Sequence, residues 1–392
     1  MTFEQSLSER LEVRRKQFRY RRRRVLTSAQ GSEITVDGKR LLNFCSNDYL
    51  GLADHPSVKQ AFADAVQRFG GGAGASHLVC GHSQEHHRLE EELAAWTGRE
   101  RALVFSSGYM ANLGVINTLV AKGDAVFEDK LNHASLLDGG LISGARFKRY
   151  RHNDWAHCDQ LLADSEGRLK LIVTDGIFSM DGDMAPLTPL TQVAKKHSAW
   201  LMVDDAHGLG WLGDSGAGCA DAQGLDQNAL PVLMGTFGKA LGTAGAFVAG
   251  SELLIESLIQ FARTYIYTTA LPPALAAATR QSLKLVQEED WRRNHLQSLI
   301  QQFREGAKAL GIPLAPSISP IQPLIVGSDR RAMALADALY EQGFWVSPIR
   351  PPTVPEGSAR LRFTLSASHT QSHVQKLLSA LERCDVLREE RE

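Results

Sequence analysis

Short apolar runs alternate with amphipathic stretches over residues 90–247 of this chain. Five of the runs have the length of buried strands, at residues 102–105, 125–127, 169–174, 200–204 and 232–235. The stretches between them have the spacing of helices with one apolar face. Strands that alternate with helices require crossover connections, which place helices on both faces of a mostly parallel sheet. We therefore expect an α/β fold here.

The two ends of the chain have different patterns. The first 24 residues predict a helix that ends in the basic run 19–24, and the segments 34–36 and 41–44 predict a hairpin around the turn Asp37-Gly38. From about residue 275, long helical patterns precede short strands such as 323–326 and 360–364. We expect three parts: an N-terminal helix and hairpin segment (1–50), a large α/β domain (51–275) and a smaller C-terminal α+β domain (276–392).

Charge and hydropathy exclude several classes of protein. The 43 Lys and Arg residues balance 44 Asp and Glu residues in a chain of 392 residues, so no global field favours nucleic acid or an anionic membrane. No stretch approaches the roughly 18 apolar residues that span a bilayer, and the polar N-terminus lacks the apolar core of a secretory signal. We expect a soluble, cytoplasmic protein without nucleic-acid or membrane partners.

The pattern of cysteines and histidines does not predict a metal site. Five cysteines are scattered without a Cys-x-x-Cys pair, so we expect reduced thiols. His82 and His86 are four residues apart on a probable helix, and His87 follows them. Without an acidic or third ligand placed nearby, this pattern does not predict a bound metal.

Two polar residues follow the apolar run 200–203. Asp204 ends the run, where a buried carboxylate is costly without a partner, and a cationic heterocycle would be such a partner. His207 comes three residues later, within reach of the same site. Taken alone, each residue is more often a structural polar group with satisfied hydrogen bonds.

Lys239 changes this interpretation. It follows the run 232–235 and is flanked by Gly238, Ala240 and Gly242, which leave room for a planar group. A surface lysine is the ordinary alternative, but a confined apolar turn disfavours the charged amine and makes it a nucleophile toward an aldehyde. A lysine that forms a Schiff base, paired with an aspartate at a pyridine nitrogen, is typical of pyridoxal phosphate enzymes. We predict this cofactor on Lys239.

Two glycine-containing turns bear on phosphate binding. Ser107-Gly108-Tyr109 lies between a strand and a helix, whose first backbone amides favour a phosphate, although this composition is common. The segment 235–240 resembles the phosphate-binding loop of nucleotide hydrolases. Leu233 stands where that loop needs glycine and Ala240 where it needs a hydroxyl, which argues against a kinase or ATPase.

Five segments together resemble the α-oxoamine synthases, a fold-type-I branch of the pyridoxal phosphate enzymes, over nearly the whole chain. They are Asn-Phe-Cys-Ser-Asn-Asp-Tyr-Leu-Gly-Leu at 43–52, Asn-His-Ala-Ser at 132–135, Phe-Ser-Met-Asp-Gly-Asp at 178–183, Asp-Asp-Ala-His-Gly at 204–208 and Thr-Phe-Gly-Lys at 236–239. The resemblance implies that the large domain binds pyridoxal 5′-phosphate. It also implies a homodimer with active sites shared between subunits.

The resemblance assigns roles to the matching residues. Lys239 would carry the cofactor and move the substrate's Cα proton, Asp204 would pair with the pyridine nitrogen, and His133 would stack on the ring. Contacts to the phenolic oxygen would come from Ser179 and His207, and contacts chiefly to the phosphate from Gly108, Tyr109 and Thr236. The implied catalytic set is therefore Lys239, His133, Asp204 and His207.

The implied substrate residues lie mostly near the ends of the chain. Arg362 would hold the amino acid carboxylate by a two-pronged hydrogen bond, His133 would also contact the substrate, and Arg21 and Thr353 match acyl-substrate positions. One departure is Asp175, where the family pattern leads us to expect glutamate, and the partner of this shorter side chain stays open.

Members of this family acylate the Cα of an amino acid with a thioester and release carbon dioxide. The segment 346–355 favours the members of biotin synthesis, which condense L-alanine with a pimeloyl thioester, over 5-aminolevulinate synthase or 2-amino-3-ketobutyrate ligase. The basic run could meet pimeloyl-CoA or a pimeloyl acyl carrier protein, so the carrier stays open, as does the strictness for alanine over glycine. An aminotransferase on the same fold and a noncatalytic scaffold are the competing functions.

Overall fold

The computed structural model describes residues 1–384, which form two compact units. The sheet unit contains Leu52–Ser179 and Asp183–Arg293. The terminal unit contains Met1–Gly51, Met180–Gly182 and the described residues from Asn294 onward. The three-part division at residues 50 and 275 stays a prediction.

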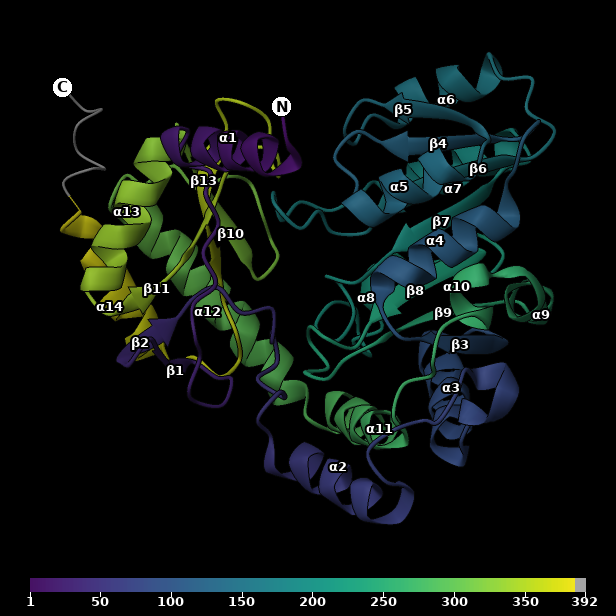
Figure 1. Cartoon of the computed structure of the whole chain (residues 1–392), viewed down its shortest axis with the longest axis horizontal. Helices are drawn as coiled ribbons and strands as arrows, with labels where there is room; N and C mark the ends of the chain where they lie inside the picture. The colour runs from purple at the N-terminus through teal and green to yellow at the C-terminus, as the bar shows by residue number, and fades with distance from the viewer. Residues whose placement is uncertain (385–392) are drawn as a thin grey trace. The chain divides into compact units, whose positions relative to one another are not determined.

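The sheet unit is built around one sheet of seven strands. Their order is β3-β9-β8-β7-β6-β4-β5 (Figure 1). Strand β9 is antiparallel to both of its neighbours, β3 and β8, whereas every other neighbouring pair is parallel. The strands are β3 (Arg101–Phe105), β4 (Ala125–Asp129), β5 (Arg146–Tyr150), β6 (Lys170–Asp175), β7 (Trp200–Asp204), β8 (Val232–Thr236) and β9 (Ala246–Gly250).

Most strands of this sheet are buried on both faces because helices cover it. Alternate residues of a strand point to opposite faces; Leu171 and Val173 of β6 pack in one core cluster with residues of α4 and α9, while Ile172 between them is also fully buried. The helices are α2 (Pro56–Phe69), the π-helix η1 (His77–Gly81), α3 (Gln84–Thr97), α4 (Gly108–Leu119), α5 (Ala134–Ile142), α6 (Trp155–Ala163), α7 (Leu187–Lys196), α8 (Gly218–Ala222), α9 (Glu252–Phe261), α10 (Arg263–Ile266) and α11 (Pro273–Glu288).

The apolar pattern predicted five of these seven strands. The mostly parallel sheet is confirmed, and the two strands that the pattern did not indicate have local reasons. Strand β5 reads Arg-Phe-Lys-Arg-Tyr and lies at the sheet edge, where four of its five residues are not buried. Strand β9 reads Ala-Phe-Val-Ala-Gly and is fully buried, but the connection from β8, residues 237–245, contains no helix.

The terminal unit holds two small sheets. The predicted hairpin is confirmed: β1 (Glu33–Val36) pairs with β2 (Lys39–Asn43), and the turn residues Asp37 and Gly38 have φ of 48° and 80°, as a tight hairpin turn requires. Strand β11 (Phe344–Trp345) extends this sheet. The second sheet has the order β10 (Ile321–Gly327), β13 (Ala359–Thr364), β12 (Ser347–Ile349), and helices α13 (Asp329–Glu341) and α14 (Gln371–Glu382) belong to the same unit.

The N-terminal helix is shorter than predicted. Helix α1 (Phe3–Lys16) buries no residue and ends before the basic run, so the prediction of a helix through residue 24 is wrong. Arg19 forms ion pairs with Asp329 at 2.6 Å and Glu356 at 2.5 Å, and Arg24 pairs with Asp37 at 3.3 Å. These contacts join the run to other parts of the terminal unit, and residues 19–25 form neither a helix nor a strand.

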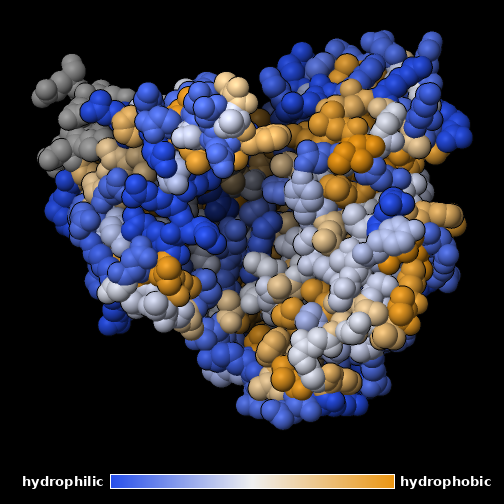
Figure 2. Space-filling view, viewed as in Figure 1, coloured by the Kyte–Doolittle hydropathy of each residue, from blue (hydrophilic) through white to orange (hydrophobic). Residues whose placement is uncertain are grey.

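Side-chain character differs along the visible surface. Polar residues cover most of the face seen in Figure 2, and apolar residues gather over α5, where Leu141 and Ile142 are exposed. Helix α12 (Asp290–Ala309) is the longest helix within residues 1–384. In that part of the chain, no helix is both long enough and apolar enough to cross a membrane.

Candidate active site

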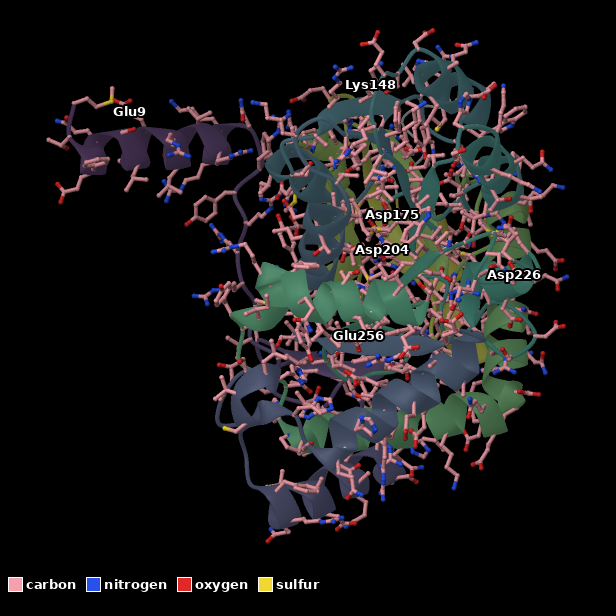
Figure 3. The ribbon with its side chains drawn as sticks, turned by 90° about the vertical axis from the view of Figure 1, so that its right-hand side faces the viewer. Glu9, Lys148, Asp175, Asp204, Asp226 and Glu256 are labelled. Atoms are coloured by element: carbon pink, nitrogen blue, oxygen red, sulfur yellow. The ribbon has the colours of Figure 1, made fainter. Side chains whose placement is uncertain are left out.

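Polar residues end three neighbouring strands of the large sheet. Asp175 is the last residue of β6, Asp204 of β7 and Thr236 of β8. Because these strands are parallel, their carboxyl ends meet at one edge, where open α/β sheets bind ligands. Asp175 and Asp204 are paired in the register of β6 and β7 and lie close together inside the sheet unit (Figure 3).

The Asp204 carboxylate is held by a chain of hydrogen bonds. Its Oδ2 accepts from Asn112 Nδ2 at 2.7 Å, and its Oδ1 accepts from the Ala206 backbone N at 3.0 Å; the residue is only 4% exposed. Asn112 Nδ2 also donates to Ser135 Oγ at 2.8 Å. Two fixed donors therefore orient a buried carboxylate before any ligand arrives.

This chain continues to His133 and sets its tautomer. Ser135 Oγ lies 2.8 Å from His133 Nδ1. The Ser135 backbone N also donates to His133 Nδ1 at 3.3 Å, so Nδ1 is an acceptor and a neutral His133 carries its proton on Nε2. Sequence reasoning missed Asn112 and Ser135. The one available signal was Asn112 itself, a polar residue on the apolar helix α4 that is fully buried.

His133 caps helix α5 at the edge of the sheet. Although the residue is exposed, its surroundings lower the pKa of the ring, first through desolvation, and the charge of Lys239 lowers it further against the opposing effect of Asp204. The imidazole is therefore mostly neutral near pH 7. A neutral, flat ring fixed by its backbone and by Ser135 is suited to lie against another ring.

Asp175 has a defined partner, which resolves the question left by its shorter side chain. Its Oδ2 accepts from the backbone N of His133 at 2.6 Å, and the residue is 3% exposed. Burial raises the pKa of Asp175 well above its usual value, and the neighbouring Asp204 charge raises it further. The departure from glutamate therefore still provides an acceptor that fixes the position of His133.

Lys239 lies in a tight turn between β8 and β9. The Gly242 backbone N donates to the Lys239 carbonyl at 2.9 Å, and the Thr243 N donates to the Phe237 carbonyl at 2.8 Å. Gly242 has a φ of 65°, and a Cβ there would lie 2.4 Å from Ala53 N, so the turn requires glycine. Lys239 is half-buried in this turn.

Lys239 acts electrostatically on two residues of the site. Its charge lowers the pKa of both His133 and Asp175. Since Asp204 affects the same two residues, the structure brings Lys239, His133 and Asp204 into one site. These three residues lie far apart in the sequence and belong to different strand ends.

The N-terminus of α4 forms a cradle with Thr236. Ser107 Oγ accepts from the Met110 backbone N at 3.3 Å and caps the helix. The Thr236 side chain packs against Gly108, because a Cβ on Gly108 would lie 2.8 Å from Thr236 Cγ2. Thr236 Oγ1 is buried without a protein partner. A phosphate at this helix N-terminus would supply that partner, so these residues fit the phosphate of the predicted cofactor.

The other predicted cofactor residues also belong to the sheet unit. Tyr109 is 43% exposed on α4, and its hydroxyl donates to Asp138, which raises its pKa. Ser179 follows β6 and is half-buried. His207 lies in the turn after β7 with 6% exposure, and its backbone carbonyl accepts from Trp211 Nε1 at 2.6 Å. That bond fixes the turn that carries the imidazole.

The predicted carboxylate-binding residue lies in the terminal unit. Arg362, on β13, is 5% exposed and donates to Asn47 Oδ1 and Thr364 Oγ1, each at 3.1 Å. Both of these acceptors are neutral. Burial raises the pKa of Tyr49 to about 12, against the opposing effect of the Arg362 charge. Arg362 therefore keeps a fixed guanidinium in a buried, low-dielectric setting.

The two predicted acyl-substrate residues contact each other in the same unit. Arg21 Nη2 donates to Thr353 Oγ1 at 3.3 Å, and both residues are exposed. Beside them lies a groove of about 730 Å³ with basic and aromatic walls. Its lining includes Tyr20, Arg21, Arg22, Arg24, Trp345 and Arg350.

Known proteins resemble this chain over nearly its full length. The 8-amino-7-oxononanoate synthase of Cellvibrio japonicus is 63% identical over 96% of this chain and 95% of its own. A serine palmitoyltransferase variant from S. paucimobilis, solved with a bound PLP–myriocin aldimine, has a TM-score of 0.92 at 32% identity, with 98% of this chain and 97% of that chain covered. The 8-amino-7-oxononanoate synthase of Francisella tularensis has a TM-score of 0.78 at 34% identity over 89% and 99%.

A match to a known protein family is consistent with these relatives and with the geometry of the sheet unit. The description of aminotransferases of class I and II matches residues 39–381, which include every strand from β2 to β13. The fold-type-I architecture expected from the sequence is confirmed by the superposition on serine palmitoyltransferase. The chain therefore belongs to the aminotransferase class I and II family, within its branch of α-oxoamine synthases.

Proposed function

We propose that this chain condenses L-alanine with a pimeloyl thioester to give 8-amino-7-oxononanoate, carbon dioxide and a free thiol, with pyridoxal 5′-phosphate as cofactor. The observation that carries the proposal is the 63% identity to a synthase of that name over 96% of the chain. The site supports the same chemistry, since a buried, oriented Asp204, a half-buried Lys239 and an unpartnered Thr236 hydroxyl suit this cofactor.

Residues of the sheet unit would hold and use the cofactor. When bound, its electron-poor ring takes up the electron pair left at Cα of the amino acid. Asp204 would accept a hydrogen bond from the pyridine nitrogen and keep it protonated, and the donors from Asn112 and Ala206 would hold the carboxylate in place. Lys239 Nζ would attach the cofactor in the resting enzyme and later carry the Cα proton.

The remaining residues would position the cofactor around these two groups. His133 would stack on the ring, Ser179 and His207 would contact the phenolic oxygen, and Gly108, Tyr109 and Thr236 would hold the phosphate. The neutral His133 imidazole avoids repulsion with the positive charge of the protonated pyridine ring. Catalysis would then depend on Lys239, Asp204, His133 and His207.

Residues of the terminal unit would bind the substrates. Arg362 would grip the alanine carboxylate, for which its planar guanidinium supplies two parallel donors. Arg21 and Thr353, which already contact each other, would meet the acyl substrate. The neighbouring basic groove suits either phosphate-bearing carrier, coenzyme A or an acyl carrier protein.

Two further properties are part of the proposal. The family resemblance supports a homodimer with shared active sites. None of the five cysteines, which all lie within residues 1–384, forms a disulfide bond, which suits the reducing cytoplasm as the place of action.

A product assay with purified protein tests the proposed reaction. We expect the kcat/KM for L-alanine with pimeloyl-CoA or a pimeloyl carrier protein to exceed that for glycine with succinyl-CoA or acetyl-CoA, measured by thiol release and product mass. One methyl group contributes only about 1–3 kcal/mol in an apolar pocket, so some activity with glycine is expected. A higher kcat/KM for a glycine pair would refute the substrate assignment. Amino-group exchange without thiol release would indicate an aminotransferase instead.

A second experiment tests the cofactor residue separately. Borohydride reduction should fix the cofactor on Lys239, and peptide mapping should find the label there in the parental protein. The variant Lys239→Ala should bind the cofactor without a covalent bond and lose turnover. The matched variant Lys195→Ala, at an exposed lysine of α7, should keep both the label and the activity. A label on another lysine would refute the assignment.

A further inference from the structure

A group of histidines and one glutamate lies in the sheet unit outside the predicted cofactor residues. His77 begins the π-helix η1, His82 directly follows it, and His86, His87 and Glu90 belong to α3. In two sets, His77, His82 and His86 or His82, His87 and Glu90, the possible ligand atoms lie within 4.8 Å of one another. The sequence pattern did not predict a metal site here. Glu90 lies three residues after His87 in the sequence, and the structure directs its side chain toward His82.

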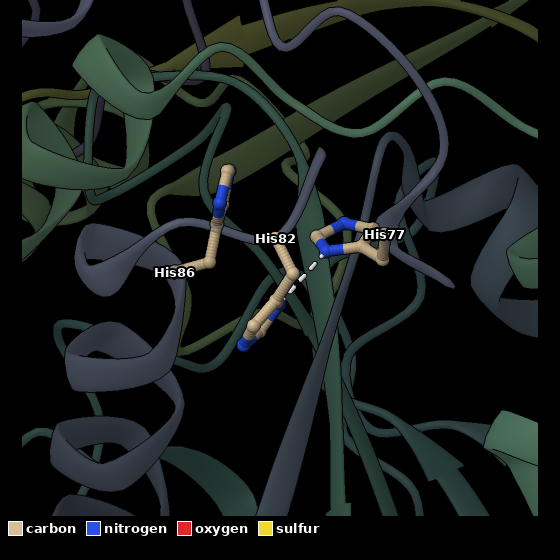
Figure 4. Close-up of side chains that lie close together, drawn as sticks. All are labelled: His77, His82 and His86. Atoms are coloured by element: carbon tan, nitrogen blue, oxygen red, sulfur yellow. Dashed lines mark hydrogen bonds between the residues drawn. The ribbon is translucent and has the colours of Figure 1, made fainter. Parts of the chain in front are cut away.

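Hydrogen bonding excludes His86 as a ligand. Its Nε2 lies 2.8 Å from the Leu271 carbonyl oxygen, which only accepts, so Nε2 carries the proton. Its Nδ1 therefore has the lone pair and accepts from the Ser83 backbone N at 3.0 Å as a helix cap. Neither ring nitrogen is left for an ion. Of the three rings in Figure 4, His77 and His82 are the pair joined by a hydrogen bond.

The second set has the chemistry and spacing of a metal site. His87 and Glu90 are three residues apart on α3 and share one face of the helix. His82 Nε2 lies 3.9 Å from Glu90 Oε2, too far for a hydrogen bond. Ligand atoms about 2.1 Å from a tetrahedral zinc ion are about 3.4 Å apart, so small side-chain rotations close this gap. Two imidazoles and one carboxylate are typical ligands of divalent transition metals.

The surroundings favour a cation between these groups. The Glu90 side chain is 13% exposed; its Oε1 accepts from the Val104 backbone N at 2.9 Å, which leaves Oε2 directed at His82. A divalent ion would pair with the Glu90 carboxylate, and the exposed His82 and His87 give it access.

His77 supplies the supporting contact that ligating histidines usually have. Its Nδ1 lies 3.1 Å from His82 Nδ1, so a His82 proton on Nδ1 would point to His77 and leave the Nε2 lone pair toward Glu90. The His77 ring is itself fixed, because it stacks on Tyr265 with an angle of 13° between the planes and is 8% exposed.

We propose that His82 Nε2, an imidazole nitrogen of His87 and Glu90 Oε2 bind one divalent transition-metal ion of the zinc class, with His77 as the residue that orients His82. The ion would join the segment after η1 to helix α3 and stabilise this corner of the sheet unit. The proposal is independent of the proposed function, because no residue of the site has a role in the cofactor chemistry.

Zinc titration of the cofactor-loaded protein, after removal of metals with a chelator, tests the site. We expect one Zn²⁺ per chain by competition with a chromogenic chelator. The variants His82→Gln, His87→Gln and Glu90→Gln should each weaken binding at least about tenfold, and His77→Gln by about 10–100-fold, the range for partners of ligating residues. Two control variants, Cys80→Ser at an exposed thiol and His157→Gln on α6, should bind zinc like the parental protein.

Two further measurements distinguish an ion at this site from zinc bound elsewhere on the protein. The unfolding midpoint should rise with added Zn²⁺ in the parental protein and stay constant in His87→Gln, whose substituted side chain is exposed and leaves the core unchanged. The Co²⁺-substituted protein should show bands of nitrogen and oxygen ligands without a thiolate charge-transfer band. Absence of stoichiometric binding would overturn the proposal, as would full affinity in both His87→Gln and Glu90→Gln, or loss of affinity in a folded His86→Gln alone.

Discussion

Adding one methyl group at Gly108 should weaken cofactor binding through Thr236. A Cβ at this position would lie 2.8 Å from Thr236 Cγ2, whereas carbon atoms in contact are about 3.5–4.0 Å apart. The other neighbours, Cε and Sδ of Met234, lie at 3.5 and 4.0 Å and do not clash. The substitution Gly108→Ala therefore displaces Thr236 by at least about 0.7 Å, and with it the hydroxyl that has no protein partner.

The size of the effect follows from this overlap. Overpacking by one methyl group costs about 1–3 kcal/mol. If Thr236 moves to relieve the overlap, its hydroxyl is displaced and the free energy of phosphate binding becomes less favourable. About 1.4 kcal/mol of binding free energy corresponds to a tenfold change in Kd. We expect the Kd for pyridoxal phosphate, measured by absorbance titration of the cofactor-free protein, to rise about 5- to 150-fold.

Two variants make this test specific. Gly72→Ala is the matched control, because a Cβ at Gly72 meets nothing within 4 Å, and its Kd should equal the parental value. In the double variant Gly108→Ala/Thr236→Ser, the clashing methyl group is removed while the hydroxyl stays, so most of the lost affinity should return. An unchanged Kd in Gly108→Ala would refute the reasoning. A loss that persists fully in the double variant would show that the new methyl group acts on the ligand and not on Thr236.

Three further substitutions test other residues of the predicted site. The pKa of Asp175 is raised in the folded state above its usual value of 3.8, so the parental protein loses stability as the pH rises above 3.8. The variant Asp175→Asn lacks this ionisation, so its free energy of unfolding in urea, relative to that of the parental protein, should increase from pH 4 to pH 8. An equal difference at both pH values would contradict this. Asp204→Asn should slow α-proton exchange of L-alanine more than about tenfold, or about 1.4 kcal/mol, with a smaller change in cofactor Kd, and exchange at the parental rate would exclude the proposed role. Arg21→Ala should raise the KM for the pimeloyl thioester up to about tenfold through loss of a charged hydrogen bond while the KM for alanine stays constant; equal changes in both would argue against an acyl-substrate contact.

The sequence could predict the features that depend on local order along the chain. The central strands of the sheet read as apolar runs because both of their faces are buried, and the turn Asp37-Gly38 has the residues that positive φ angles demand. The pattern identified Asp204 and Lys239 because a charged group near the end of a buried strand is costly to bury without a partner. The family resemblance then supplied the substrates, which no pattern of polar and apolar positions contains.

The pattern of apolar and polar residues could not predict features that depend on pairing between distant segments. The edge strand β5 is mostly polar, so its place beside β4 is set by pairing and not by its own composition. The helix predicted through residue 24 ends at Lys16, because Arg19 finds its carboxylate partners more than 300 residues away.

The sequence by itself determined the types of chemical group available and the strand ends at which they lie. Tertiary structure alone decided which of them touch: it joined Asp204 to His133 through Asn112 and Ser135, gave Asp175 the backbone of His133 as its partner, and directed Glu90 toward His82. The physical reason is that hydrogen bonds and charges act over a few ångströms, whereas the residues of most of these pairs are separated by 8 to 92 positions in the chain. Only the packing of strands and helices brings such residues within that range.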